Sequence, residues 1–204
     1  LLRNFAKQLE RHSFQAHGSG KSGIIQVTRC GQEVLERTAC EIEEKTGNII
    51  VRFEVGFPAR GRTIQAGELI KILYQYLPAC VEKALYYKNM DQNAVKRAAE
   101  LAVDQEYIRE QLKKEGLIAF VADGSILPRE SGVSQRPMKD AVPFVSPDSM
   151  KVTMKLPYKG VLTGMGIRKG ITLVVGGGYH GKSTLLKALE SGVYPHIAGD
   201  GREY

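Results

Sequence analysis

Residues 176–184 carry the strongest chemical signal in the sequence. They read Gly-Gly-Gly-Tyr-His-Gly-Lys-Ser-Thr and match the pattern G-x-x-x-x-G-K-[ST]. Glycines let the backbone turn so that several amide groups point at one phosphate, at the positive end of a following helix. We expect Lys182 to reach the outer phosphates of a nucleotide and the Ser183 hydroxyl to bind Mg²⁺. The expected nucleotide-binding residues are Gly176, Gly177, Gly178, Tyr179, His180, Gly181, Lys182, Ser183 and Thr184.

Two flanking segments must position this loop. The apolar run at residues 171–175 predicts a buried β-strand that enters the loop, and the pattern at 185–189 predicts a helix that leaves it. The alternative is a glycine-rich turn that merely joins a strand to a helix. The strand–loop–helix context disfavours that alternative.

The residues around the loop resemble the opening of an ABC-type nucleotide-binding domain. The resemblance starts at residues 164–170, Gly-Met-Gly-Ile-Arg-Lys-Gly, and continues through the apolar run and the loop. Tyr179 and His180, with Gly-Asp-Gly-Arg-Glu-Tyr at 199–204, make the chain similar to the predicted ATPases of the ABC class, in which an amino-terminal domain precedes the ATPase core. The similarity extends upstream through residues 56–62 and 124–129.

The resemblance implies ATP and Mg²⁺ as cofactors, ATP hydrolysis by the intact protein, and a homodimer formed over the nucleotide. In the family's order, the remaining catalytic motifs would follow Tyr204. We therefore expect an amino-terminal fragment that binds ATP and is inactive alone.

ABC-type domains stack adenine on an aromatic side chain, and Tyr158 and Phe144 are the nearest options. A kinase-like phosphoryl transferase is a further alternative, since this loop type is shared across nucleotide-binding families.

Composition bounds the class of protein. With 204 residues and 43% apolar side chains, the chain can bury a globular core, and no apolar run reaches membrane-spanning length. Cys30, Cys40 and Cys80 are odd in number and form no C-x-x-C pair, which favours a reducing, cytoplasmic compartment. The net charge of +7 suits a polyphosphate as well as RNA or DNA, so charge alone does not decide between them.

A basic loop in the first half of the chain supports a second function. Arg60 and Arg62 are separated by one glycine, and paired guanidinium groups can grip phosphate oxygens. Lys21 lies in Gly-Lys-Ser, which imitates the end of a phosphate loop, but Gln15 stands where the first glycine should be. A nucleic-acid-binding module that uses Arg60, Arg62 and Lys21 is therefore the alternative function, and solvated turns are equally open.

The fold class predicted is an α+β amino-terminal domain, residues 1–146, followed by the truncated start of an α/β P-loop domain, residues 147–204. Helices are expected at 1–12, 69–77, 81–85 and 95–112, and strands at 24–29, 38–44, 48–57, 117–122, 151–156 and 161–163. The Pro-rich stretch 126–147 is expected to be a connector, with Arg129 and Arg136 either bridging the domains or solvated. Asp200 is expected to be a loop aspartate. We also expect residues after about 146 to be less stable than the amino-terminal domain, or covered by a partner chain.

Overall fold

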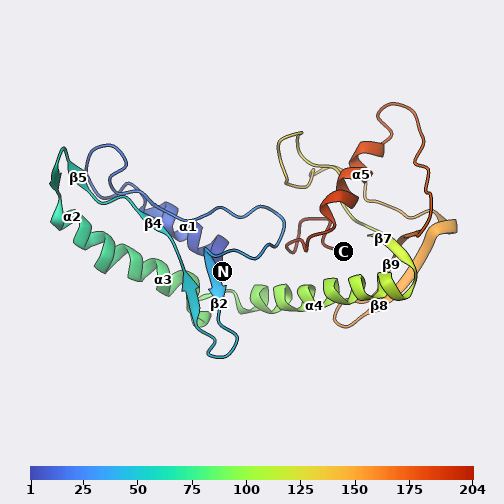
Figure 1. Ribbon diagram of the computed structural model, residues 1–204, viewed down its shortest axis with the longest axis horizontal. Helices are drawn as coiled ribbons and strands as arrows, with labels where there is room; N and C mark the ends of the chain where they lie inside the picture. Colours follow the sequence, from blue (N-terminus) through green and yellow to red (C-terminus); the bar gives the residue numbers. More distant parts are fainter. The chain divides into compact units, whose positions relative to one another are not determined.

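The computed structural model describes residues 1–204, which form two compact units (Figure 1). The amino-terminal unit comprises Leu1–Cys30 and Glu36–Gln92, and the carboxy-terminal unit comprises Gly31–Leu35 and Asn93–Tyr204. Both combine helices and strands, in agreement with the predicted mixture. The division near Gln92 does not coincide with the boundary expected near residue 146, which lies inside the second unit.

Hydrogen bonds explain why the Pro-rich connector does not separate two units. Ser146 is buried, and its amide and hydroxyl donate to the Asp123 carboxylate at 2.6 and 3.0 Å. The Phe144 amide donates to the Ser125 carbonyl at 2.8 Å, and the Gly124 amide donates to the Phe144 carbonyl at the same distance. The connector is irregular, as expected, but hydrogen bonds fix it to residues 123–125, which follow the strand Leu117–Ala122.

The amino-terminal unit is built from short elements. They are α1 (Leu2–His12), β1 (Ile25–Gln26), β2 (Cys40–Ile42), β3 (Ile49–Val51), β4 (Glu54–Val55), β5 (Ala59–Arg60), β6 (Thr63–Ile64), α2 (Ala66–Lys71), a π-helical segment (Ile72–Tyr76), α3 (Leu77–Leu85) and a 3₁₀ turn (Tyr87–Asn89). Three antiparallel pairs form: β1 with β4, β2 with β3, and β5 with β6. The predicted first helix and the predicted hairpin are confirmed, although the hairpin ladder is only three residues long.

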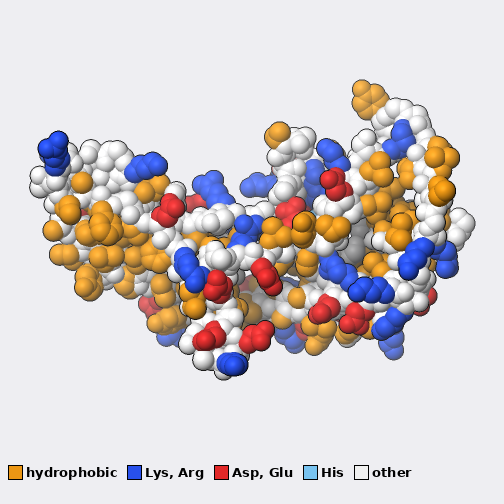
Figure 2. All heavy atoms as spheres, in the orientation of Figure 1, with side chains coloured by type: hydrophobic (Ala, Val, Ile, Leu, Met, Phe, Trp, Pro, Cys, Tyr) orange, Lys and Arg blue, Asp and Glu red, His pale blue; other side chains and the backbone are white.

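The core of this unit lies between α1 and α3. Phe5 and Leu9, at helical spacing on α1, are fully buried against Ile72, Cys80 and the first strand. Outside this core, hydrophobic side chains gather over α2 and α3 (Figure 2), and Tyr74 is 75% exposed. The amino-terminal unit therefore buries one face of its helices and leaves apolar groups on another.

The carboxy-terminal unit contains a three-stranded antiparallel sheet with β9 at its centre. Its elements are α4 (Gln92–Lys114), β7 (Leu117–Ala122), a 3₁₀ turn (Asp148–Met150), β8 (Lys151–Leu156), β9 (Gly160–Arg168) and α5 (Lys182–Ser191). One core cluster includes Ile108 of α4, and another includes Ala188 of α5, so each helix packs with residues of the sheet. None of the helices has the length and apolar character needed to cross a bilayer.

The predicted strand at residues 171–175 is wrong for this structure. The segment follows β9 but pairs with no strand, and Ile171 and Leu173 are almost fully exposed. β9 already pairs with β7 on one edge and with β8 on the other. Residues 171–175 therefore cannot lie at the centre of this three-stranded sheet. An apolar run predicts burial without specifying a neighbour.

Candidate functional site

The glycine-rich loop leads directly into α5. Gly181, the residue before the helix, has a φ of 78°, a left-handed conformation that favours glycine. The Leu185 amide makes the first helical turn's bond, to the Gly181 carbonyl at 2.9 Å. The amides of Lys182, Ser183 and Thr184 therefore lie at the positive end of the helix, where such groups have no intrahelical acceptor and can bind an anion.

Lys182 folds back over the loop that precedes it. Its ammonium group donates a hydrogen bond to the Gly176 carbonyl at 2.6 Å and another to the Gly177 carbonyl. No acidic side chain pairs with it. The structure thus brings the lysine to the loop that the motif assigns to it, and backbone oxygens supply the negative partners that a phosphate group could replace.

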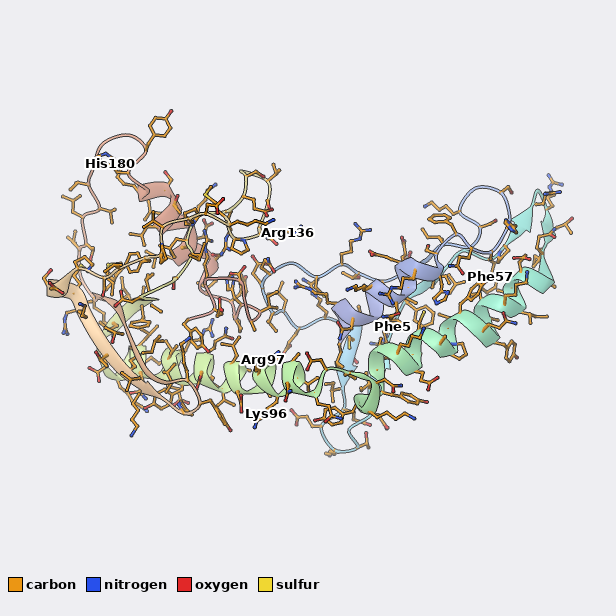
Figure 3. The ribbon with its side chains drawn as sticks, turned by 180° about the vertical axis from the view of Figure 1, so that it is seen from behind. Phe5, Phe57, Lys96, Arg97, Arg136 and His180 are labelled. Atoms are coloured by element: carbon orange, nitrogen blue, oxygen red, sulfur yellow. The ribbon has the colours of Figure 1, made fainter.

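His180 makes a second contact across the same loop. Its Nδ1 accepts a hydrogen bond from the Gly177 amide at 3.2 Å, and Figure 3 shows the residue in the loop that leads into α5. Tyr179 beside it has a φ of 63° and a fully exposed side chain. The motif gave neither residue an individual role, yet His180 occupies one of the loop's amide donors.

Ser183 is exposed on the first turn of α5. No group of three or more His, Cys, Asp or Glu side chains in the structure is arranged to hold a metal ion. The Ser183 hydroxyl is a hard oxygen ligand at the amino end of α5. Hard oxygen ligands of this kind suit Mg²⁺, which keeps several waters.

The two aromatic options for adenine lie in different environments. Phe144 packs against the core cluster that contains Ala188, whereas Tyr158 lies in the turn between β8 and β9 and is 58% exposed. Only Tyr158 presents a largely open ring.

Asp200 is a loop residue, as expected, but it is completely buried. Arg129 binds it twice: Nη2 donates to the carboxylate at 2.9 Å and Nη1 donates to the backbone carbonyl at 2.8 Å. The solvated alternative for Arg129 is therefore wrong, because its side chain is only 13% exposed. Arg136, the other connector arginine, is exposed. Arg129 joins the connector to the last residues of the carboxy-terminal unit, and this contact links the two sides of the boundary expected near residue 146.

Arg202 makes contacts within the carboxy-terminal unit that the sequence did not predict. Its Nε donates to the Leu127 carbonyl at 3.0 Å and its Nη1 donates to the Ser191 hydroxyl at 3.1 Å. Burial, and then the nearby Arg129 charge, lower the pKa of Arg202 to about 10. Leu127 and Ser191 lie 75 and 11 residues away from Arg202 in the sequence, so no local pattern indicated these contacts.

A cavity of about 230 Å³ lies between α4, β7, α5 and the final segment. Apolar side chains such as Ile108, Leu112 and Val121 line it, with Arg202 and Glu203 among the polar groups. None of residues 176–184 lines this cavity, so it is distinct from the glycine-rich loop.

In the amino-terminal unit, the three basic residues lie on adjoining loops. Arg60 ends β5 and Arg62 follows in the turn before β6, while Lys21 belongs to the loop 17–23. The Ser22 hydroxyl receives a hydrogen bond from the Ala59 amide at 3.1 Å and so fixes that loop to β5. All three basic side chains are on exposed residues.

Comparison with known proteins gives two consecutive family matches. Residues 1–88 match the amino-terminal domain of ATPases of the ABC class, and residues 91–204 match the P-loop domain of the same class. The chain is also 30% identical over 142 residues to an uncharacterized protein of Methanocaldococcus jannaschii, an alignment that covers 66% of this chain and 32% of that protein. The alignment thus spans about a third of the relative's length. The chain belongs to the ABC-class ATPases of the P-loop superfamily, with the family's amino-terminal domain followed by its P-loop domain.

Proposed function

We propose that the carboxy-terminal unit binds Mg-ATP through residues 176–184. The observation that carries the proposal is the ammonium group of Lys182, 2.6 Å from the Gly176 carbonyl, within a loop that ends at the positive terminus of α5. Membership of a P-loop ATPase family supports nucleotide binding in general. The position of Lys182 at the amino end of α5 supports the proposal that the phosphates bind at this loop.

Residues 182–184 have separate tasks in this proposal. The amides of residues 182–184 donate to phosphate oxygens, and Lys182 exchanges two carbonyl partners for the outer phosphates. The Ser183 hydroxyl holds Mg²⁺, which when bound neutralises charge on the phosphates. Because Lys182 is already at the loop, binding requires its partners to change and not a long movement of the side chain.

Hydrolysis of ATP is assigned to the intact protein. It needs a group that orients water and charge stabilisation beyond the phosphate cradle. We assign residues 176–184 the phosphate-binding part of the site, because Lys182 and His180 contact the backbone of this loop. We propose that the intact protein dimerises over the nucleotide. The three free cysteines are consistent with the proposed cytoplasmic location.

Calorimetry with ATP and Mg²⁺ tests the site. Lys182→Ala should weaken binding by roughly tenfold to a hundredfold, since a hydrogen bond to a charged group contributes about 1.5–3 kcal/mol. Lys187→Ala is the matched control, because it removes one exposed lysine from the same helix. Ser183→Ala should reduce the gain in affinity on adding Mg²⁺. Equal affinity of the Lys182 and Lys187 variants would remove the site assignment.

The second candidate function is nucleic-acid binding by the amino-terminal unit. The hydrogen bond between Ala59 and Ser22 favours it, because it places the Lys21 loop beside the hairpin that carries Arg60 and Arg62. Several exposed cations on adjoining loops can contact successive phosphates. We propose RNA or DNA as the ligand, bound mainly through its backbone.

Fluorescence anisotropy with labelled RNA and DNA tests this second function. Affinity should fall steeply as salt rises, and Arg60→Ala with Arg62→Ala should weaken binding and flatten that dependence. Lys7→Ala with Lys45→Ala removes the same charge from exposed positions elsewhere in the unit. Equal losses in the two double variants would show attraction to net charge without a defined site.

A further inference from the structure

The carboxyl end of α5 is held by two side chains from the segment that follows it. His196 Nε2 lies 3.1 Å from the Ser191 carbonyl oxygen, and Arg202 Nη1 donates to the Ser191 hydroxyl at 3.1 Å. Ser191 is the last residue of α5, whose first residue is Lys182. A ten-residue helix is a nearly rigid rod, so what holds one end also fixes the direction of the other.

His196 lies between two hydrogen-bond acceptors. Its Nδ1 is 2.8 Å from Asp200 Oδ2, and its Nε2 faces the Ser191 carbonyl. A carbonyl oxygen can only accept, and the Asp200 carboxylate also accepts from Arg129 at 2.9 Å. A neutral imidazole carries one N–H, so it can satisfy only one of these contacts. Both contacts are satisfied only when both ring nitrogens are protonated.

We infer that His196 is a buried cation that positions α5, and that the affinity of the phosphate loop therefore depends on a proton held outside that loop. The side chain of His196 is 3% exposed and that of Asp200 is 0% exposed, so water replaces neither partner. Loss of the proton leaves a nitrogen lone pair opposite an oxygen. The Ser191 carbonyl or the Asp200 carboxylate is then released.

Charged groups from several segments surround this histidine. Asp200 and Glu33 are the acidic groups that favour its cationic form, while Arg129 and Arg202 are the basic groups nearby. From α4, the neutral side chain of Gln105 donates to the His196 carbonyl at 2.8 Å. Burial alone would lower the pKa of His196, but the hydrogen bonds to Asp200 and Ser191 outweigh it and raise the pKa above its ordinary value.

The raised pKa of His196 determines how stability changes with pH. Because the pKa of His196 is raised on folding, its contribution to stability is fully present below the unfolded pKa of about 6.5 and is lost as pH rises through the folded pKa. The same proton holds α5 in place. The link to nucleotide affinity rests on the nucleotide-binding function proposed above, whereas the charge of His196 does not.

Nuclear magnetic resonance of the 204-residue chain measures that charge without any nucleotide. Nitrogen chemical shifts of the four histidine rings, assigned with His196→Gln, should show both nitrogens of His196 protonated at pH values above the ordinary histidine pKa of about 6.5. Asp200→Asn removes the ionised acceptor and should move the titration of His196 to lower pH. A His196 that is neutral at pH 6, or that titrates with the exposed histidines, overturns the inference.

Calorimetry with ATP against pH tests the positioning role. The wild-type affinity should fall by several-fold as pH rises through the measured titration of His196. His196→Gln offers a neutral amide N–H to Ser191 at every pH, so that fall should disappear, whereas His196→Ala should bind weakly throughout. All other ionisable groups, those of ATP included, are common to the three proteins, so the difference between their pH profiles isolates the effect of His196.

The two measurements separate the possible failures. Suppose that His196 stays protonated to high pH, but that ATP affinity depends on pH in the same way in the wild type and in His196→Gln. That result overturns the positioning role and leaves the nucleotide site intact. Absence of ATP binding in the wild type overturns the proposed function and its link to His196, while the resonance measurement still decides the charge of the ring.

Discussion

Nδ1 of His180 accepts a hydrogen bond from the Gly177 amide at 3.2 Å, so a side chain of the phosphate loop occupies one of the loop's own donors. A phosphate that uses this amide must displace the imidazole. In the proposed nucleotide site, His180 would therefore compete with the ligand for the Gly177 amide.

This competition predicts that His180→Ala and His180→Phe both bind ATP more tightly than the wild type. Freeing one amide donor should be worth about 0.5–1.5 kcal/mol, which is roughly a twofold to tenfold gain in affinity. Calorimetry at a pH where histidine is neutral measures it. Weaker binding by both variants would show instead that the ring itself contacts the phosphates.

The glycine-rich loop and the helix after it were predictable because their signal is local. The glycines, the lysine and the helix that follows are contiguous, and α1, β7 and β8 likewise have boundaries close to those that their periodicity predicts. Contacts between distant residues have no such signal. Arg129 and Asp200 are 71 residues apart, and only the fold shows that they pair.

Asp104 is another residue whose role depends on the fold. It lies on α4 with 1% exposure, and its two carboxylate oxygens accept the amides of Tyr158 and Lys159, each at 2.9 Å. Both amides belong to the turn between β8 and β9. The carboxylate therefore ties the sheet's hairpin to the helix.

We predict that Asp104→Asn lowers the free energy of unfolding by about 1–3 kcal/mol, since an amide side chain offers one oxygen where two acceptors are needed. Urea denaturation followed by circular dichroism measures the change. Glu106→Gln on the same helix is the control, because that residue is exposed and its change should stay within about 0.5 kcal/mol. Equal effects of the two substitutions would contradict the anchoring role.

Gly164, at the centre of β9, allows close contact between neighbouring strands. A Cβ atom there would lie 2.4 Å from the Val121 carbonyl oxygen, which is backbone and cannot turn aside. Gly164→Ala should therefore cost about 1–3 kcal/mol or more of stability by overpacking. The control is Gly132→Ala, where an added Cβ meets nothing within 4 Å. A thermal melt in which both variants unfold together would refute the contact.

The segment 171–175 shows where hydrophobicity misleads. Its Ile, Leu and Val residues satisfied the pattern of a buried strand, but a strand also needs neighbours whose N–H and C=O groups pair with its own. Such neighbours come from distant sequence, and the pattern of one segment does not contain them. The structure leaves the side chains of Ile171 and Leu173 in solvent.

This arrangement predicts rapid hydrogen exchange at residues 171–175, because none of these amides donates to a backbone carbonyl. Amides of β9 that pair with β7 and β8 should exchange far more slowly and serve as the internal control, since they lie in the same unit. The hairpin at residues 38–57 should also exchange more slowly than 171–190. Mass spectrometry of peptides after timed labelling measures all three regions. Protection at 171–175 equal to that of β9 would mean that another strand covers this segment in solution, and its exposed apolar side chains would then belong to a buried sheet.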